Sequence, residues 1–284
     1  MIFWIASYPK SGNTWLRALI SSYYFSKDGV FKKDIIKNID QFPEKIHFSN
    51  FNYDHKNIIG TTQFWIKAQE KINSDRKVKF FKTHNIFGKI NKQPFTNKSN
   101  SIACIYIVRD PRNVITSLMN HYSIENYNQA LKFILDKDRF SGKFGEKKSF
   151  TRETEFPTYI SNWSNHYNSW KSFKKNYLLI RYEDLVKNPQ GKFKEIADYL
   201  AKLLKIQIDN KDINYAITQS SFKNLKKSEE IYGFDEAPPD ETTNRKKKFF
   251  NLGPDNQWQK YLSQDIQNKI ENSFKNEMKE LNYL

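Results

Sequence analysis

Short apolar runs alternate with longer segments of helical periodicity along this 284-residue chain. Four runs have the length and composition of buried strands: Ile2–Ala6, Val78–Lys82, Ile102–Val108 and Tyr177–Arg181. Apolar residues at helical spacing predict helices over Thr14–Tyr24, Thr61–Asn73, Arg112–Tyr122, Tyr159–Lys174, Lys192–Leu204, Ile213–Ser220 and Ser263–Leu281. Strands separated by helices predict an α/β fold, in which residues 1–284 form a single domain with a central, mainly parallel sheet flanked by helices.

One internal segment, residues 123–158, breaks this alternation. It is polar, contains Gly142 and Gly145, and includes a charged tract from Asp136 to Lys148. Long polar segments inside a compact domain are often functional loops. We therefore expect residues 123–158 to form an insertion or lid on the substrate side, and the following segment Tyr159–Trp170 to help frame the acceptor entrance.

Polar side chains follow each of the four predicted strands. The first strand leads into the loop Tyr8–Trp15, and the second ends in Lys82 before Thr83-His84. The third is followed by Arg109–Arg112, and the fourth by Tyr182. Open α/β sheets bind ligands at the carboxyl ends of their strands, so these four segments should meet at one edge of the sheet.

The loop after the first strand has the composition of a phosphate-binding turn. A strand, a small-residue turn and a helix N-terminus bring free backbone N–H groups and the positive end of the helix dipole toward an anion. Gly12 allows close approach of the backbone and Lys10 adds a charge, while Ser11, Asn13 and Thr14 supply further donors. The alternative is an ordinary capped helix after a first strand.

The order of these segments resembles that of a known family. Tyr8–Trp15 is similar to the 5′-phosphosulfate loop of the sulfotransferases that use 3′-phosphoadenosine 5′-phosphosulfate (PAPS), and Tyr106–Ser117 is similar to their 3′-phosphate segment. Lys82–His84 resembles their catalytic Lys-Thr-His, and Arg181–Leu185 their Tyr-Glu-Asp-Leu element. The resemblance covers nearly the whole chain and implies a PAPS-dependent sulfotransferase with a P-loop-like phosphosulfate-binding loop.

The resemblance also implies the catalytic residues. It makes His84 the general base, Lys10 the cation that stabilises charge on the leaving phosphate, and Lys82 an auxiliary cation. A histidine, with a reference pKa near 6.5, suits proton removal from an acceptor hydroxyl at neutral pH. The alternative for His84 is a structural histidine near a strand end. We expect the remaining histidines to be surface or packing residues: His47, His55, His121 and His166.

The nucleotide ligands follow from the same resemblance. It assigns the 3′-phosphate to Arg109 and Ser117, the two faces of adenine to Trp15 and Phe222, and the edge of the base to Tyr182. Stacking on aromatic rings suits a planar purine. Two alternatives stay open: Arg109 could instead pair with Asp110 at a helix cap, and each aromatic residue could instead belong to the core.

A later segment departs from the family pattern. The family has Arg-Lys-Gly before an Asp/Asn-Trp element, whereas this chain has Asn251 and Leu252 before Gly253. Gly253 could still offer its backbone to the 3′-phosphate. The adjacent run Arg245–Lys248 could supply the missing charge from a shifted register, with Arg245 as the candidate ligand, or it could be an ordinary solvated charge run.

The charge and cysteine content limit the partners and the compartment. The formal net charge is +16, from 39 Lys, 8 Arg and 31 acidic residues. Such a charge favours anions, but a chain poor in Arg is not typical of a specific nucleic-acid reader. Cys104 is the only cysteine and lies in an apolar run, which indicates a buried thiol and a cytoplasmic protein. The longest apolar run is far shorter than the about 20 residues of a membrane span.

The sequence thus predicts a sulfotransferase with PAPS as co-substrate and no metal. The acceptor could be a small molecule, a lipid or a saccharide, and the oligomeric state cannot be derived. One alternative is a P-loop kinase, although Trp4 and Pro9 stand where its glycines belong. The other is a catalytically degenerate, basic protein that binds polyanions.

Overall fold

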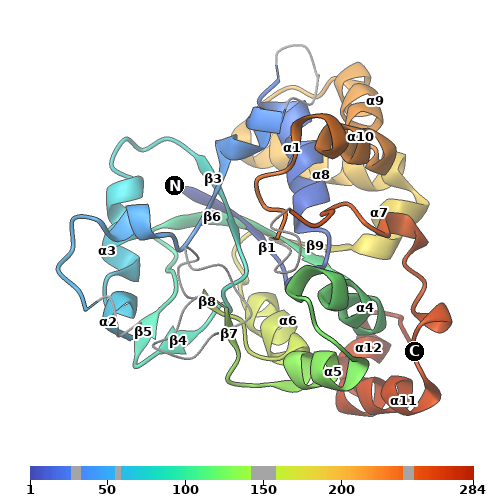
Figure 1. The fold of residues 1–284 in the computed structure, drawn as a ribbon. Coiled ribbons are helices and arrows are strands. Elements are labelled where there is room, and N and C mark those ends of the chain that lie inside the picture. Colours follow the sequence, from blue (N-terminus) through green and yellow to red (C-terminus); the bar gives the residue numbers. More distant parts are fainter. Residues whose placement is uncertain (27–32, 55–58, 142–157, 239–245) are drawn as a thin grey trace.

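A five-stranded parallel sheet forms the centre of the molecule (Figure 1). The computed structural model describes residues 1–26, 33–54, 59–141, 158–238 and 246–284. In spatial order, the strands are β2 (Ile39–Gln41), β3 (Lys79–Thr83), β1 (Ile2–Ala6), β6 (Ser101–Val108) and β9 (Tyr177–Arg181). Two antiparallel pairs lie outside this sheet: β4 (Lys89–Ile90) with β5 (Gln93–Pro94), and β7 (Phe140–Ser141) with β8 (Thr158–Tyr159).

Helices cover both faces of the sheet, as expected for a single α/β domain (Figure 1). They are α1 (Asn13–Tyr24), α2 (Ile59–Thr62), α3 (Trp65–Ile72), α4 (Pro111–Tyr122), α5 (Tyr127–Leu135), α6 (Trp163–Lys171), α7 (Tyr182–Lys187), α8 (Pro189–Leu204), α9 (Asn210–Gln219), α10 (Phe222–Tyr232), α11 (Gln264–Ser273) and α12 (Lys275–Glu280). Short 3₁₀ turns are η1 (Lys33–Asn38), η2 (Lys45–Phe48), η3 (Gly253–Asp255) and η4 (Trp258–Lys260). Within the described residues, no helix is long and apolar enough to cross a membrane.

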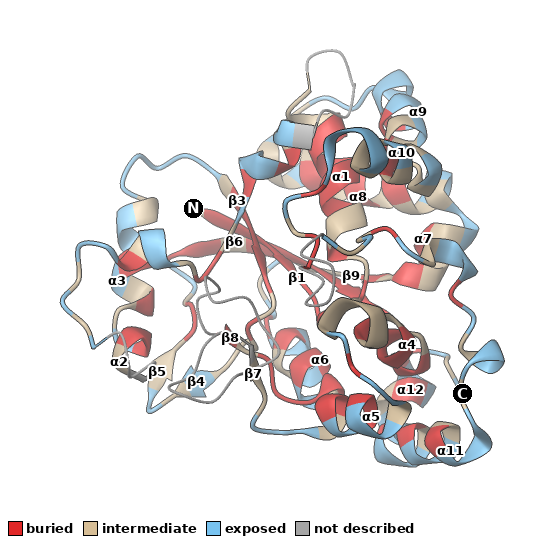
Figure 2. Ribbon diagram, viewed as in Figure 1, coloured by how far each residue is buried: buried red, intermediate tan, exposed pale blue. Residues whose placement is uncertain are grey.

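The central strands are buried on both faces, so nearly all their side chains are apolar (Figure 2). Phe3 and Ile5 of β1 pack with the helices α1, α8 and α9. Trp4 and Ala6, which alternate with them, pack with α3, α4 and α6 on the other face. Cys104 of β6 is buried, as predicted.

Most predicted elements are confirmed, but some boundaries are wrong. The predicted helix Thr61–Asn73 is interrupted between α2 and α3, and the predicted C-terminal helix is divided into α11 and α12 at Phe274. The predicted helix Tyr159–Lys174 begins only at Trp163, after strand β8. There Asn162 accepts a hydrogen bond from the Asn165 amide and caps the helix.

The prediction of a lid over residues 123–158 is wrong for its first part. Residues Tyr127–Leu135 form helix α5, which begins at an Asn126 cap. Its residues Ala130, Leu131, Phe133 and Ile134 are buried in the main core. Residues 142–157 lie outside the described part of the chain. The prediction that Tyr159–Trp170 helps to frame the acceptor entrance is also wrong for Trp163 and Trp170, because both are fully buried in the core.

Candidate active site

One large cavity opens at the carboxyl ends of the strands. Its volume is about 620 Å³, and its wall includes residues that follow four different strands. Lys10 follows β1, His84 follows β3, Arg109 follows β6 and Tyr182 follows β9. The sheet therefore brings together the segments that the sequence places after its strands, as expected for an open parallel sheet.

The loop between β1 and α1 takes a backbone conformation that a glycine makes possible. Gly12 has φ of +97°, and a Cβ atom there would lie 2.5 Å from the Tyr182 ring. Lys10 also has a positive φ, +65°, which is uncommon for a side-chain-bearing residue. Asn13 fixes the start of α1 by donating to the Ile5 carbonyl and the Ser7 hydroxyl, at 3.1 and 3.2 Å. The start of α1 therefore lies at the cavity wall, and free amides at a helix start favour an anion.

The predicted ligands of this loop do not all face the cavity. Lys10, Gly12, Asn13, Thr14 and Trp15 line its wall. Ser11 does not line the wall, because its side chain is fully buried. Its hydroxyl has no hydrogen-bond partner among the described residues. Ser11 could therefore serve a phosphate only through its backbone, and its role stays a prediction.

Arg109 and Ser117 meet at a second polar position. Arg109 donates from Nη1 to the Ser117 hydroxyl at 3.1 Å and to the Lys10 carbonyl at 3.2 Å. Its Nη2 donates to the Gly253 carbonyl at 3.4 Å. The guanidinium carbon lies 4.2 Å from the Tyr182 ring centroid, which fixes the plane of the group. The guanidinium thus joins segments from three parts of the chain at one position suited to a phosphate.

The alternative of an ion pair between Arg109 and Asp110 is excluded. Asp110 caps α4 and pairs instead with Arg112, at 2.7 Å. Arg112 also pairs with Glu271, at 2.6 Å. The Asp110 carboxylate is therefore paired with Arg112, and Arg109 lines the cavity wall.

Trp15 and Phe222, the two predicted adenine neighbours, both line the cavity. The Trp15 indole donates to the Ser220 carbonyl at 2.9 Å, which fixes the ring at the end of α9. Phe222 lies against Gly253, where a Cβ atom would approach the ring to 2.3 Å. Gly253 also has a positive φ, +55°. This position therefore requires glycine both for its backbone conformation and for the space beside Phe222.

The hydrogen bonds of His84 define which of its nitrogens can act as a base. Nδ1 lies 2.7 Å from the Ser7 carbonyl, and a carbonyl can only accept, so Nδ1 carries the proton. The neutral ring then has its free electron pair on Nε2. Burial, and next the nearby charge of Lys82, lower the pKa of His84 to about 4. The ring is therefore neutral at pH 7.

A second histidine, His166, contacts the backbone of His84. His166 is fully buried, and its Nε2 lies 3.1 Å from the His84 carbonyl. Its Nδ1 lies 2.8 Å from the Tyr106 hydroxyl. Burial lowers the pKa of His166 to about 3, so this ring is also neutral. His166 is thus the packing residue that the sequence predicts.

The comparisons with known proteins agree with this geometry. The family model of the sulfotransferase domain matches residues 2–282. This chain belongs to the sulfotransferase family. The 3-beta-hydroxysteroid sulfotransferase of Cavia porcellus is 24% identical over 249 residues, which are 84% of this chain and 70% of that protein.

Solved structures share the fold of this sulfotransferase. The mouse sulfotransferase SULT7A1 complexed with PAP is similar with a TM-score of 0.61, at 20% identity, over 98% of this chain and 84% of the other. Retinol dehydratase in a complex with retinol and PAP has a TM-score of 0.64, at 17% identity, over 98% of this chain and 81% of the other. The protein is therefore an enzyme of the PAPS-dependent sulfotransferase class.

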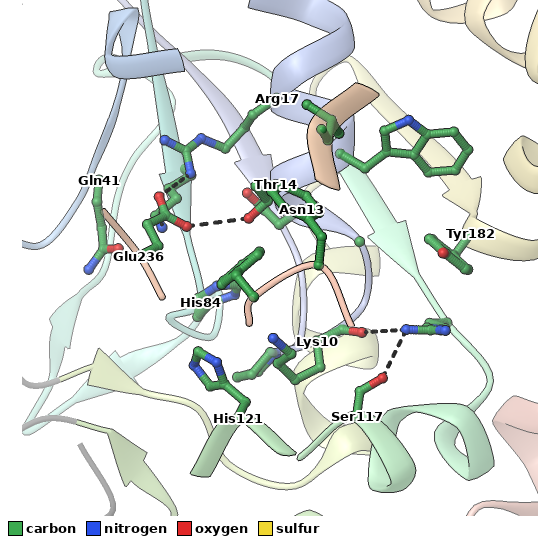
Figure 3. A pocket seen from close by; sticks show the side chains of 18 of the residues that line it. Lys10, Asn13, Thr14, Arg17, Gln41, His84, Ser117, His121, Tyr182 and Glu236 are labelled. Atoms are coloured by element: carbon green, nitrogen blue, oxygen red, sulfur yellow. Dashed lines mark hydrogen bonds and ion pairs between the residues drawn. The ribbon is translucent and has the colours of Figure 1, made fainter. Parts of the chain in front are cut away.

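Two charged residues of this sulfotransferase site were missed from the sequence. Glu236 accepts from Arg17 Nη1 at 2.6 Å (Figure 3) and from Lys82 Nζ at 2.9 Å. Arg17 is almost fully buried and also donates to the Ile39 carbonyl at 3.0 Å. An arginine three residues after Thr14, on the same face of a helix, is a signal for Arg17. The sequence around Glu236 carries no comparable signal.

One histidine that the sequence analysis sets aside also belongs to the cavity. His121, near the end of α4, lines its wall, and Figure 3 draws it near Lys10 and His84. Its ring packs 5.9 Å from the Phe249 ring. The expectation that His121 is only a surface or packing residue is therefore incomplete.

The segment Asn251–Gly253, whose sequence differs from the family pattern, lies at the cavity. The basic residues Lys246–Lys248, which precede it, do not line the cavity. Asn251, Leu252 and Gly253 line the wall. Three lysines of the predicted run bind elsewhere: Lys246 donates to the Phe234 carbonyl, Lys247 to the Ser123 hydroxyl, and Lys248 pairs with Glu230. Arg245 lies outside the described residues, so its assignment to the nucleotide stays a prediction.

Proposed function

We propose that this enzyme transfers the sulfuryl group of PAPS to a hydroxyl or amine of a small-molecule acceptor, with His84 as general base. The observation that carries this proposal is the fixed tautomer of His84. Its Nδ1 is engaged by the Ser7 carbonyl, so an unprotonated Nε2 stands in the same cavity as the phosphate loop. A neutral base beside an anion site is what sulfuryl transfer to a hydroxyl requires.

The transfer conserves atoms and charge. His84 Nε2 takes the hydroxyl proton while the acceptor oxygen forms a bond to sulfur. The bond from sulfur to the bridging oxygen breaks at the same time, and adenosine 3′,5′-bisphosphate leaves. Lys10 and Lys82, which both line the cavity, would stabilise the negative charge that grows on the leaving phosphate and on the sulfuryl oxygens. In this step His84 becomes an imidazolium, which then loses its proton to water.

The nucleotide would occupy two anion positions and one aromatic position. We assign its 5′-phosphosulfate to the loop at Lys10 and Thr14, and its 3′-phosphate to Arg109 and Ser117. Adenine would lie near Trp15, Phe222 and Tyr182. These residues line one cavity of about 620 Å³, which is within the range of small-molecule sites.

The wall that would face the acceptor carries both apolar side chains, Ile39, Phe42 and Ile46, and polar ones. Gln41, Glu44 and Lys45 line this part of the wall, between the end of β2 and η2. Glu44 is partly buried, and burial raises its pKa. The names of two similar proteins indicate small alcohols, a hydroxysteroid and retinol. A small hydroxyl-bearing acceptor is thus the first class to test, with lipids and saccharides in the same screen.

The first prediction is selective stabilisation by the bisphosphate. Adenosine 3′,5′-bisphosphate should raise the melting temperature in differential scanning fluorimetry, because at about 100 times its dissociation constant a ligand contributes about 2.7 kcal/mol. AMP and ATP lack the 3′-phosphate that we assign to Arg109 and Ser117, so their shifts should be much smaller. Equal shifts with AMP and the bisphosphate would refute this assignment. A polyanion-binding protein without a nucleotide site would show no preference for the bisphosphate over inorganic polyphosphate.

The second prediction concerns pH and rests on Lys10. Burial, and next the charge of Arg109, lower the pKa of Lys10 to about 7. Above that pH the free protein must take up a proton to bind an anion there, so bisphosphate affinity should fall as pH rises from 7 to 9. The bisphosphate affinity should fall by a factor that approaches about tenfold per pH unit. Phosphate groups, with a second pKa near 6, are already ionised in this window.

Isothermal titration calorimetry in buffers of different ionisation enthalpy measures this proton uptake directly. The matched variant is Lys10→Arg, which keeps its charge throughout the window. It should bind the bisphosphate with a much flatter pH dependence. An equally steep dependence in that variant would assign the proton to another group.

A further inference from the structure

The carboxylate of Glu236 occupies an anion position inside the cavity. It accepts from Arg17 at 2.6 Å and from the Thr14 hydroxyl at 3.3 Å (Figure 3), and also from Lys82 at 2.9 Å. Arg17 and Thr14 belong to α1, whereas Lys82 belongs to β3. One carboxylate thus satisfies donors from two elements that the sheet brings to the same place.

Glu236 is held there as an anion. Burial alone would raise its pKa, but the charges of Arg17 and Lys82 keep the pKa well below its usual value. The neighbouring Phe234 and Ala237 are buried in a separate apolar cluster against α1, and the Ala237 amide donates to the Phe234 carbonyl at 3.2 Å. This turn fixes the backbone on both sides of Glu236, so its side chain points toward the donors.

Two of these donors have proposed roles toward the nucleotide. Thr14 belongs to the loop that we assign to the 5′-phosphosulfate, and Lys82, in β3, is one of the two lysines proposed to stabilise the leaving phosphate. The Thr14 hydroxyl has a single hydrogen, so it cannot donate to Glu236 and to a phosphate at the same time. A carboxylate next to a bound phosphosulfate would also repel it.

We propose that Glu236 is an internal competitor for the 5′-phosphosulfate position, and that nucleotide binds by displacing its carboxylate from Thr14 and Lys82. This inference rests on the proposed function, because it takes that position from the nucleotide assignment. Only the fraction of molecules in which Glu236 has moved away is competent to bind. The apparent affinity for nucleotide is reduced by that fraction.

The test compares Glu236→Gln with the wild-type protein by calorimetry, using two ligands. Adenosine 3′,5′-bisphosphate should bind the variant about tenfold more tightly, because its internal competitor has lost its charge. Adenosine 3′-monophosphate has no 5′-phosphate, so its affinity should stay unchanged. The melting temperature of the nucleotide-free variant should fall, since the neutral amide no longer forms the ion pairs with Arg17 and Lys82. A residue with a purely structural role would lower both the melting temperature and the bisphosphate affinity.

Two further variants complete the experiment. Glu230→Gln removes the same charge from α10 at an exposed residue outside the cavity wall, and it should leave both affinities unchanged. Glu236→Asp keeps the charge but shortens the side chain, so it should raise bisphosphate affinity by less than Glu236→Gln. This second variant keeps the test decisive if the first does not fold.

Three results would overturn the proposal. Unchanged or weaker bisphosphate binding by a folded Glu236 variant would show that the carboxylate does not compete. An equal gain for both ligands, or the same gain in Glu230→Gln, would assign the effect to net charge. Failure of the wild-type protein to bind the bisphosphate would remove the proposed function, and this inference with it.

Discussion

Replacing His84 with alanine should reduce sulfuryl transfer by about 10²–10⁴-fold, the usual effect of losing a general base. The bisphosphate should still bind with nearly wild-type affinity, because His84 is hydrogen-bonded to the Ser7 carbonyl rather than to the predicted phosphate ligands. The loss should therefore appear in kcat and not in nucleotide affinity. Initial rates with saturating PAPS, together with bisphosphate calorimetry on the same preparation, separate the two effects.

His121→Ala is the comparison variant for this experiment, because it removes a second imidazole from the same cavity wall. Its effect on kcat should be much smaller than that of His84→Ala. Because the pKa of His84 is lowered to about 4, the base stays neutral down to mildly acidic pH, and the wild-type rate should not fall between pH 7 and pH 5 from protonation of this residue. If His84→Ala keeps normal turnover while His121→Ala loses it, the base is His121.

Replacing Arg109 with alanine should produce the largest loss of nucleotide affinity. Truncating a charged group that is buried and hydrogen-bonded to its ligand costs about 2–5 kcal/mol, or about 30-fold to several thousand-fold in affinity. Arg109 is nearly buried, and its guanidinium also joins Ser117, Lys10 and Gly253. Calorimetry with adenosine 3′,5′-bisphosphate measures the loss.

Three comparisons make this prediction specific. AMP has no 3′-phosphate, so Arg109→Ala should weaken its binding far less than that of the bisphosphate. Arg109→Lys keeps the charge but not the planar fork, and it should recover only part of the affinity. Arg76→Ala removes an exposed arginine outside the cavity wall and should change nothing. An equal loss for AMP and the bisphosphate would show that Arg109 supports the fold of the loop and does not bind the 3′-phosphate.

The sequence predicts the fold where the hydrophobic pattern is strong. The strands β1 and β6 have nearly continuous apolar runs, because a parallel sheet covered on both faces buries nearly every side chain of its central strands, and β3 and β9 carry shorter apolar runs. Strand β2 was missed because it has three residues at the edge of the sheet and only Ile39 is buried. Helix α5 was missed because a polar segment surrounds it, although Asn126 is a recognisable N-cap residue.

The site was predictable where a residue follows a strand directly. His84, Arg109 and Tyr182 reach the cavity because each stands at a strand end, and topology alone places such ends together. Glu236 stands in a turn after α10 and reaches the cavity only through tertiary packing of Phe234 and Ala237 against α1. No local pattern encodes such a contact. The burial that shifts the pKa of Lys10 to about 7 is likewise a property of the folded cavity.

The most direct test of the account follows the sulfuryl group itself. PAPS labelled in its sulfuryl group should be incubated with the protein and a panel of small alcohols, amines, lipids and saccharides, and the products separated by chromatography. The account predicts that label appears on at least one acceptor, that one adenosine 3′,5′-bisphosphate is released per labelled product, and that His84→Ala slows both signals by about 10²–10⁴-fold. Release of label only as inorganic sulfate, or the same labelled product at an equal rate from His84→Ala, would contradict it.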